Sequence, residues 1–82
     1  MQDYSKAIEL APKDPAAYNN RGVLYYRLKR YAEAISDMTT AVALNPGYTK
    51  AYYNRANAYQ KLKKYREADQ DYTRVIELDP SF

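Results

Sequence analysis

The feature that most constrains what this chain can fold into is an internal period of 34 residues. Three prolines carry the spacing, and each closes a similar phrase: IELAP at Pro12, VALNP at Pro46 and IELDP at Pro80. The segments AYNNRG and LKRYAEA return one period later as AYYNRA and LKKYREA. A fixed period in this range is typical of stacked repeat units. The chain therefore divides, within one domain, into a leading half repeat and two full repeats, at residues 1–14, 15–48 and 49–82.

Inside one repeat, the apolar residues recur with the spacing of a helix. Tyr18, Gly22 and Tyr25 share one face of a first helix, and Ala34 and Met38 share one face of a second. Each repeat is therefore a pair of antiparallel helices, and the fold class is all-α. We expect five helices, at residues 2–11, 15–28, 31–44, 49–62 and 65–78.

The ends of these helices carry recognisable signals. Asp14 followed by Pro15 predicts a helix start, because the aspartate side chain accepts hydrogen bonds from free backbone N–H groups. Thr49 is expected to cap the equivalent helix of the next repeat. Basic pairs at 29–30 and 63–64 mark the ends of the first helices, where cations meet the negative end of the helix dipole. Small residues inside the helices, such as Ala34, predict close packing within a pair.

Composition excludes most catalytic chemistry. The 82 residues contain no cysteine and no histidine, which removes disulfides, thiol nucleophiles, zinc sites built from these residues and imidazole catalysis. No glycine-rich phosphate loop is present. We therefore expect no enzyme activity, no cofactor and no metal site.

The chain also lacks membrane signals. No apolar run approaches the roughly 18 residues of a spanning helix, and the first residues do not form a signal peptide. A formal net charge of +3 is too small by itself to indicate nucleic-acid binding. These features predict a cytoplasmic protein with no membrane partner.

The residues at fixed places in each repeat resemble the tetratricopeptide repeat (TPR), whose pattern runs aromatic, Leu-Gly, Tyr, Ala, Phe and Pro. The matching residues in the two repeats are Tyr18, Arg21, Gly22, Tyr25, Ala34, Met38 and Pro46, then Tyr52, Arg55, Ala56, Tyr59, Ala68, Tyr72 and Pro80. Tyr4, Ala7 and Pro12 match the end of the pattern in the half repeat. The resemblance implies a right-handed α-solenoid that acts as a protein–protein interaction scaffold, with first helices lining its concave face.

One departure from the family pattern is consistent. Arg21 and Arg55 stand where leucine is usual, and an aspartate recurs in each second helix, at Asp3, Asp37 and Asp71. We expect a partly buried arginine–aspartate bridge at each repeat junction, because the guanidinium fork suits a carboxylate. The alternative is that both groups are solvated.

The first helices contain no acidic residue, whereas each carries several cations. The stripe that should face the concave groove is polar, basic and rich in tyrosine: Asn19, Asn20, Val23, Tyr26, Arg27, Lys50, Tyr53, Asn54, Asn57, Gln60 and Lys61. Asparagine amides can hold a peptide backbone, tyrosine offers contact area at little entropic cost, and cations favour acidic ligands. We expect an extended acidic peptide as the partner. A solvated helix face is the alternative.

Relatives that bind the acidic tails of heat-shock chaperones use a carboxylate clamp, which this chain matches only in part. With residues 15–48 taken as the middle repeat, Asn20 and Lys50 match two of its five positions. Asn54 stands in place of the clamp arginine, and the helix that supplies the first two clamp residues is missing. The sequence therefore argues against a complete clamp.

Two other functions stay open. The chain could be a structural or self-associating fragment, excised or engineered from a longer array, because both ends of the stack lack a capping helix. We expect the last helix to expose Tyr72, Val75 and Ile76, through which copies could associate. Single-stranded RNA is the other alternative, since Tyr26 and Tyr53 could stack bases, although the period favours a peptide.

Overall fold

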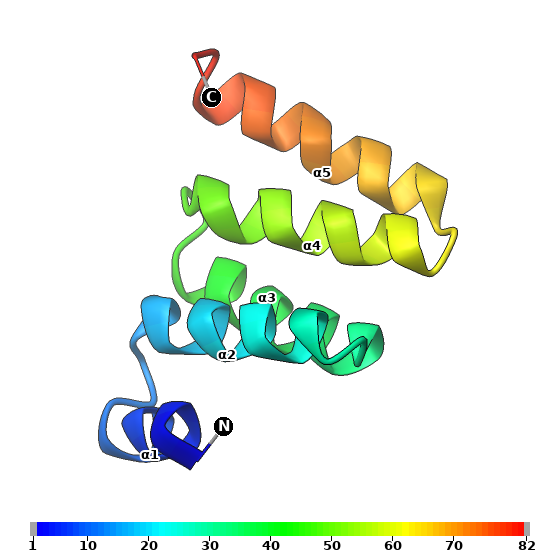
Figure 1. Cartoon of the computed structure of the whole chain (residues 1–82). Helices are drawn as coiled ribbons and strands as arrows, with labels where there is room; N and C mark the ends of the chain where they lie inside the picture. Colours follow the sequence, from blue (N-terminus) through cyan, green and yellow to red (C-terminus); the bar gives the residue numbers. More distant parts are fainter. Residues whose placement is uncertain (1, 82) are drawn as a thin grey trace.

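The computed structural model of the chain describes residues 2–81, and side chains from residue 5 to residue 81. Within residues 2–81 it contains five helices and no strand: α1 (Gln2–Leu10), α2 (Pro15–Arg27), α3 (Tyr31–Leu44), α4 (Thr49–Lys61) and α5 (Tyr65–Leu78). Helix α2 packs on α3 and α4 on α5, while α3 and α4 join the two pairs. Figure 1 shows the resulting stack, with α1 at one end and α5 at the other. The all-α repeat architecture is confirmed, with every helix boundary within one residue of its predicted place.

The start of α2 follows the prediction, but the start of α4 does not. The Asp14 side chain accepts a hydrogen bond from the Ala16 backbone N–H at 3.0 Å. Thr49 is wrong as a cap, because it is the first residue of α4 and Tyr48 stands at the cap with no side-chain hydrogen bond. Tyr48 lies one period after Asp14, and its ring packs instead against the apolar cluster around Ala51. The second repeat therefore has apolar packing where the first has a polar cap.

Both first helices end in the same tight motif. At the end of α2, the backbone N–H of Arg30 donates to the Tyr25 carbonyl and that of Lys29 to the Tyr26 carbonyl, each at 2.9 Å. This is the Schellman arrangement, which needs a left-handed residue that is usually glycine. Lys29 takes that role with φ of 63°, and Lys63 repeats it at the end of α4 with φ of 61°. A lysine in this conformation is strained, so the repeats use a charged residue where glycine fits better.

Close approach of α2 and α3 depends on Gly22. A Cβ atom on this residue would lie 3.1 Å from Cγ of Met38 and 3.2 Å from the carbonyl oxygen of Ala34. Ala34 and Met38 are fully buried and form an apolar cluster with Ala58 of α4. The predicted use of small residues inside a helix pair is confirmed.

A second cluster joins the two repeats. Ala41 and Val42 of α3 pack on Ala51 of α4, and the rings of Tyr18, Tyr48 and Tyr52 cover them.

None of the helices in the described part of the chain is both long and apolar enough to cross a membrane.

The outer face of α5 differs from the prediction in part. Ile76 is 65% exposed, as expected, but Val75 is buried and Tyr72 is half-buried. Val75 lies one period after Ala41, which is also buried, so it faces inward towards α4 rather than outward. The exposed apolar side chains of α5 are Ile76 and Leu78, with Tyr65 at its start.

Relief of strain at a helix end should stabilise the protein. We expect Lys29→Gly to raise the free energy of unfolding by about 0.5–1 kcal/mol, because glycine removes the left-handed cost while its freer unfolded chain returns part of the gain. Urea denaturation measures the change. As a control, Lys61→Gly inside the last turn of α4 should lower stability by up to about 1 kcal/mol. A loss of stability in Lys29→Gly would contradict the strain argument.

Overpacking between α2 and α3 should have the opposite effect. Ala34→Leu is expected to lower the free energy of unfolding by about 1–3 kcal/mol, because Ala34 is fully buried against Met38. Ala32→Leu, at an exposed position of the same helix, should change it by less than about 0.5 kcal/mol. Equal urea midpoints for the two variants would rule out the close packing.

Candidate functional site

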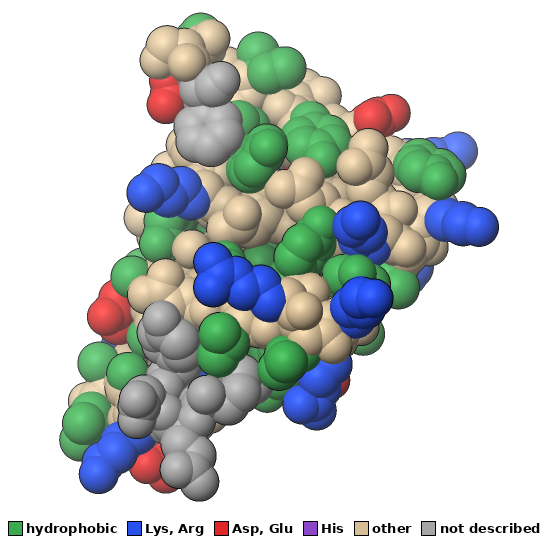
Figure 2. Space-filling model, in the orientation of Figure 1, with side chains coloured by type: hydrophobic (Ala, Val, Ile, Leu, Met, Phe, Trp, Pro, Cys, Tyr) green, Lys and Arg blue, Asp and Glu red, His purple; other side chains and the backbone are tan. Residues whose placement is uncertain are grey.

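Helices α2 and α4 form an acid-free surface at the centre of the molecule. They contact each other directly, and neither contains an aspartate or glutamate. Their exposed cations are Arg27, Lys50 and Lys61. Figure 2 shows Lys and Arg side chains spread over the middle of this face, with acidic side chains at its margins. We call this surface, formed by α2 and α4, the basic face.

The predicted site residues fall into three classes on this face. The exposed ones are Asn20, Arg27, Lys50, Tyr53, Gln60 and Lys61. The half-buried ones are Val23, Tyr26, Asn54 and Asn57. Asn19 alone is buried, with 4% of its surface exposed. Ten of the eleven residues are therefore accessible to a ligand in some degree, and Asn19 has a structural position.

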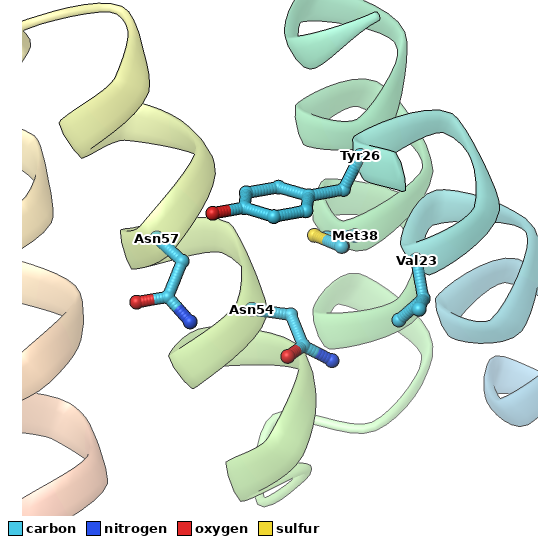
Figure 3. Close-up of a pocket in the computed structure, with 5 residues that line it drawn as sticks. All are labelled: Val23, Tyr26, Met38, Asn54 and Asn57. Atoms are coloured by element: carbon cyan, nitrogen blue, oxygen red, sulfur yellow. The ribbon is translucent and has the colours of Figure 1, made fainter. Parts of the chain in front are cut away.

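The half-buried residues surround a small cavity of about 40 Å³. Val23 and Tyr26 come from α2, Asn54 and Asn57 from α4, and Met38 from α3 closes it. In Figure 3 the Tyr26 ring extends from α2 with its hydroxyl towards α4, and the two amides lie below it along α4. Tyr26 is held from behind by an edge contact with Tyr31, whose ring centroid is 5.3 Å away. The cavity thus has an apolar end and an amide-lined end.

Asn19 connects the two helices of the basic face. Its Oδ1 atom accepts a hydrogen bond from Nδ2 of Asn54 at 3.2 Å. Because Asn19 is buried, this bond is largely shielded from water and holds the Asn54 side chain against α2. Asn19 supports the site, and Asn54 carries its accessible amide.

Asn57 is held in a similar way by α5. The hydroxyl of Tyr72 donates to Oδ1 of Asn57 at 2.5 Å. Burial raises the pKa of Tyr72 above its usual value, and neighbouring Tyr53 and Tyr26 add to the rise, so the hydroxyl keeps its proton. Tyr53 and Tyr72 meet edge to face with ring centroids 6.0 Å apart. A second helix therefore positions a side chain of the basic face.

The predicted arginine–aspartate bridges are present in both full repeats. Arg21 donates to both carboxylate oxygens of Asp37 at 2.7 Å, and Arg55 donates to those of Asp71 at 2.7 and 2.8 Å. Arg74 adds a third contact to Asp71 at 2.6 Å. The Asp71 side chain is completely buried, and that of Asp37 nearly so. These hydrogen bonds raise the pKa of both Arg21 and Arg55.

The location of the bridges requires a correction. Each joins the first and second helices of one repeat rather than two successive repeats. The contact across the junction is made by the remaining guanidinium nitrogen: Nη1 of Arg55 donates to Thr39 at 3.2 Å, and that of Arg21 lies 3.4 Å from Ser5. The Asp3 side chain lies outside the described residues. One arginine thus ties its own helix pair together and also touches the preceding second helix.

Sequence reasoning placed Met38 inside a helix pair and Tyr72 on the exposed face of the last helix, and it assigned neither residue to the site. They occupy the same place in successive repeats, and both lie behind the basic face, one under the cavity and the other on Asn57. The signal that could have found Tyr72 is its polar hydroxyl at a place where the family pattern has phenylalanine. A tyrosine hydroxyl that is partly withdrawn from water needs a partner, and here that partner is Asn57 of α4.

Breaking the second bridge should be costly. We expect Asp71→Leu to lower the free energy of unfolding by about 3–5 kcal/mol, because it leaves the largely buried Arg55 without its carboxylate. The double variant Arg55→Leu/Asp71→Leu should be more stable than Asp71→Leu, since the only cation that then lacks its carboxylate is Arg74, whose side chain is half exposed to water. Urea denaturation of all three proteins gives the comparison.

The exposed pair Arg30–Glu33 provides the control for this prediction. Both side chains are about half exposed, so Glu33→Leu should cost at most about 1 kcal/mol. If Asp71→Leu were no more costly than Glu33→Leu, the bridge would have no structural role.

Comparison with known proteins agrees with the repeat boundaries. Tetratricopeptide repeat models match residues 15–48 and 49–82. No curated protein sequence matches the chain significantly. Many solved structures do.

Three of these structures are similar over nearly the whole chain. The first TPR of Spaghetti (RPAP3), solved with the HSP90 peptide SRMEEVD, is 47% identical with a TM-score of 0.95, over 96% of this chain and 63% of that one. The first TPR domain of human RPAP3 is 47% identical with a TM-score of 0.94, over 96% and 62%. The second TPR of Spaghetti, solved with the same peptide, is 33% identical with a TM-score of 0.90, over 93% and 70%. The chain spans less than two thirds of the length of the first two domains.

The 34-residue period, the five stacked helices and these similarities all indicate the same repeat architecture. The chain belongs to the tetratricopeptide repeat family of protein-interaction modules.

Proposed function

We propose that this TPR unit binds an extended acidic peptide along the basic face. The observation that carries the proposal is the charge of α2 and α4, which lie side by side without an acidic residue and expose Arg27, Lys50 and Lys61. A protein surface that carries positive charges and no negative ones attracts acidic ligands over several ångströms and raises their association rate. The acids of the chain are kept on the second helices and turns.

The polar groups between these cations suit a peptide backbone. Asn54 and Asn57 are half-buried in the cavity wall, where their amides can both donate and accept hydrogen bonds. Tyr53, which is 39% exposed, adds ring surface with few rotatable bonds. Backbone recognition by amides combined with charge attraction favours an extended acidic segment over a folded partner.

The similar structures support this ligand class. The first and second TPRs of Spaghetti were solved with the HSP90 peptide SRMEEVD, and the second TPR domain of human RPAP3 with the HSP70 peptide SGPTIEEVD. Both peptides end in the acidic sequence EEVD. In this chain, Asn20 and Lys50 match the carboxylate clamp of such domains, whereas Asn54 replaces its arginine. The proposal therefore depends on acidic side chains, with a lesser role for the terminal carboxylate.

Fluorescence anisotropy with labelled SRMEEVD tests the proposal. Wild-type protein should prefer this peptide to an analogue whose three acids are changed to amides, and the preference should shrink at high salt. Lys50→Gln should weaken binding of the acidic peptide about 3- to 10-fold. Arg66→Gln, which removes an exposed cation from α5, should leave the affinity unchanged.

Two further ligands separate the alternatives. An amidated C-terminus measures the part played by the terminal carboxylate. A short single-stranded RNA that binds with a steep salt dependence, while the peptides do not, would assign the basic face to RNA. If neither peptide nor RNA binds, the unit is a structural spacer and the proposal is wrong.

A further inference from the structure

We propose that the edge of the stack formed by the α2–α3 and α4–α5 turns binds the surface of an anionic lipid membrane. This edge, which we call the turn edge, consists of residues 27–30 and 61–66. Its cations contact the lipid phosphates, and its exposed leucines enter the boundary between headgroups and acyl chains. The inference goes beyond the proposed function, because the basic face needs no membrane to bind a peptide.

The turn edge contains only basic, aliphatic and aromatic side chains. Every residue of its two segments, RLKR and KLKKYR, is exposed. Seven of these ten residues are lysine or arginine, which leaves six cations for the ten acids of the rest of the chain. The formal net charge of +3 therefore conceals a strongly positive edge on a molecule that is otherwise acidic.

The two segments lie on the same side of the molecule. Helices α2 and α4 contact each other and both end there. Figure 1 shows the α2–α3 and α4–α5 turns at the right and the other two connections at the left. Lys and Arg side chains gather along the right side in Figure 2, with apolar side chains between them. The opposite edge, at residues 11–14, 45–48 and 79–81, has Lys13 as its one cation, against Asp14 and Asp79.

Helix capping does not account for these cations. Arg30 and Lys64 stand at the N-caps of α3 and α5, and Arg66 lies in the first turn of α5, where the helix dipole disfavours positive charge. Arg30 is paired with Glu33 at 2.7 Å. None of the other six cations makes a salt bridge within residues 5–81. Most of the positive charge is therefore available to a ligand.

The backbone at the turn edge is strained in the same way in both repeats. Lys29 and Lys63 have φ of 63° and 61°, a conformation in which glycine costs less. Strain of this kind is concentrated at functional sites. Each strained lysine directly follows an exposed leucine, so each turn presents a cation and an apolar group together.

The apolar side chains favour a lipid surface over other anionic ligands. Leu28 is 53% exposed, Leu62 40% and Tyr65 56%. The phosphates of RNA and the carboxylates of an acidic peptide need cations but gain little from isolated leucines. At a membrane, leucine reaches the acyl boundary, tyrosine fits the headgroup layer, and lysine and arginine meet anionic lipids. All three kinds of side chain are interleaved at the turn edge.

Binding through the turn edge leaves the basic face open. Because α2 and α4 both end at this edge, they point end-on towards the membrane, and the surface along their length stays accessible to a peptide. The sequence predicted no membrane partner from the absence of spanning and signal segments, and a peripheral contact needs neither.

Co-sedimentation with lipid vesicles tests the inference on the wild-type protein. Vesicles of phosphatidylcholine that contain about one third phosphatidylserine should bind at least about 10-fold more tightly than pure phosphatidylcholine vesicles, and high salt should reduce the difference. Equal binding to both vesicles, or binding to neither, would overturn the inference.

The double variant Lys29→Gly/Lys63→Gly separates binding from folding. Vesicle binding should fall about 10- to 30-fold, because each lysine near an anionic surface contributes about a factor of five. The urea midpoint should rise, because both strained residues are replaced by glycine. A loss of binding then has no explanation in a loss of fold. Wild-type binding by this variant would contradict the role of the strained lysines and overturn the inference.

A matched pair of single variants tests the position of the charge. Lys64→Gln, at the turn edge, should weaken vesicle binding about 3- to 5-fold. Lys13→Gln removes the same charge from an exposed position at the opposite edge and should change binding by less than about 2-fold. Equal effects of the two variants would show that net charge alone attracts the protein and that the turn edge is not the site.

The double variant Leu28→Ser/Leu62→Ser keeps every charge and tests the apolar contact. Vesicle binding should fall about 3- to 10-fold, while the affinity for SRMEEVD stays that of the wild type. If the variant binds vesicles as the wild type does, the edge recognises negative charge alone and the inference is wrong. A short single-stranded RNA that binds both proteins equally, and more tightly than the vesicles, would assign the edge to nucleic acid. The peptide measurement judges the proposed function separately.

Discussion

Each helix pair depends on an arginine and an aspartate that are withdrawn from water together. The Asp71 carboxylate is completely buried, and it is stable there because Arg55 and Arg74 supply three N–H donors. The same Arg55 reaches Thr39 in the preceding repeat. One guanidinium therefore sets the distance between the helices of a pair and the register of that pair on its neighbour. The side-by-side arrangement of α2 and α4 follows from this register.

The arginine–aspartate bridges also affect how charge is distributed over the protein surface. Each aspartate of a bridge belongs to a second helix and faces into its own pair, so its negative charge is neutralised inside the protein. Tyrosine rings flank the arginines at 5.6–5.8 Å and shield them further. The cations left exposed on α2 and α4 have no acidic residue on their own helices to offset them. The same pairing that stabilises the stack therefore leaves the basic face positive.

Differences between the two repeats give the basic face its asymmetry. Gly22 faces Met38 in the first pair, and one period later Ala56 and Tyr72 occupy the same places. The methionine closes an apolar cavity, whereas the tyrosine brings a hydroxyl that holds Asn57. Because Met38 and Tyr72 belong to adjacent repeats, an apolar cavity wall and an amide held by a hydrogen bond lie beside each other. A stack of identical repeats would not provide this combination.

The 34-residue period determined the number and limits of the helices, since repetition and helix-end signals are local properties of the chain. It also indicated that the repeated arginines bridge the repeated aspartates, but it placed those bridges at the repeat junctions, whereas the structure pairs Arg21 with Asp37 and Arg55 with Asp71 inside each repeat. Only the tertiary structure decided that Asn19 is buried on Asn54, that Tyr72 holds Asn57 and that Val75 points inward. These features depend on which side chains from different helices meet. The helical period predicts the face on which a residue lies, but only packing determines whether that residue meets a ligand or another helix.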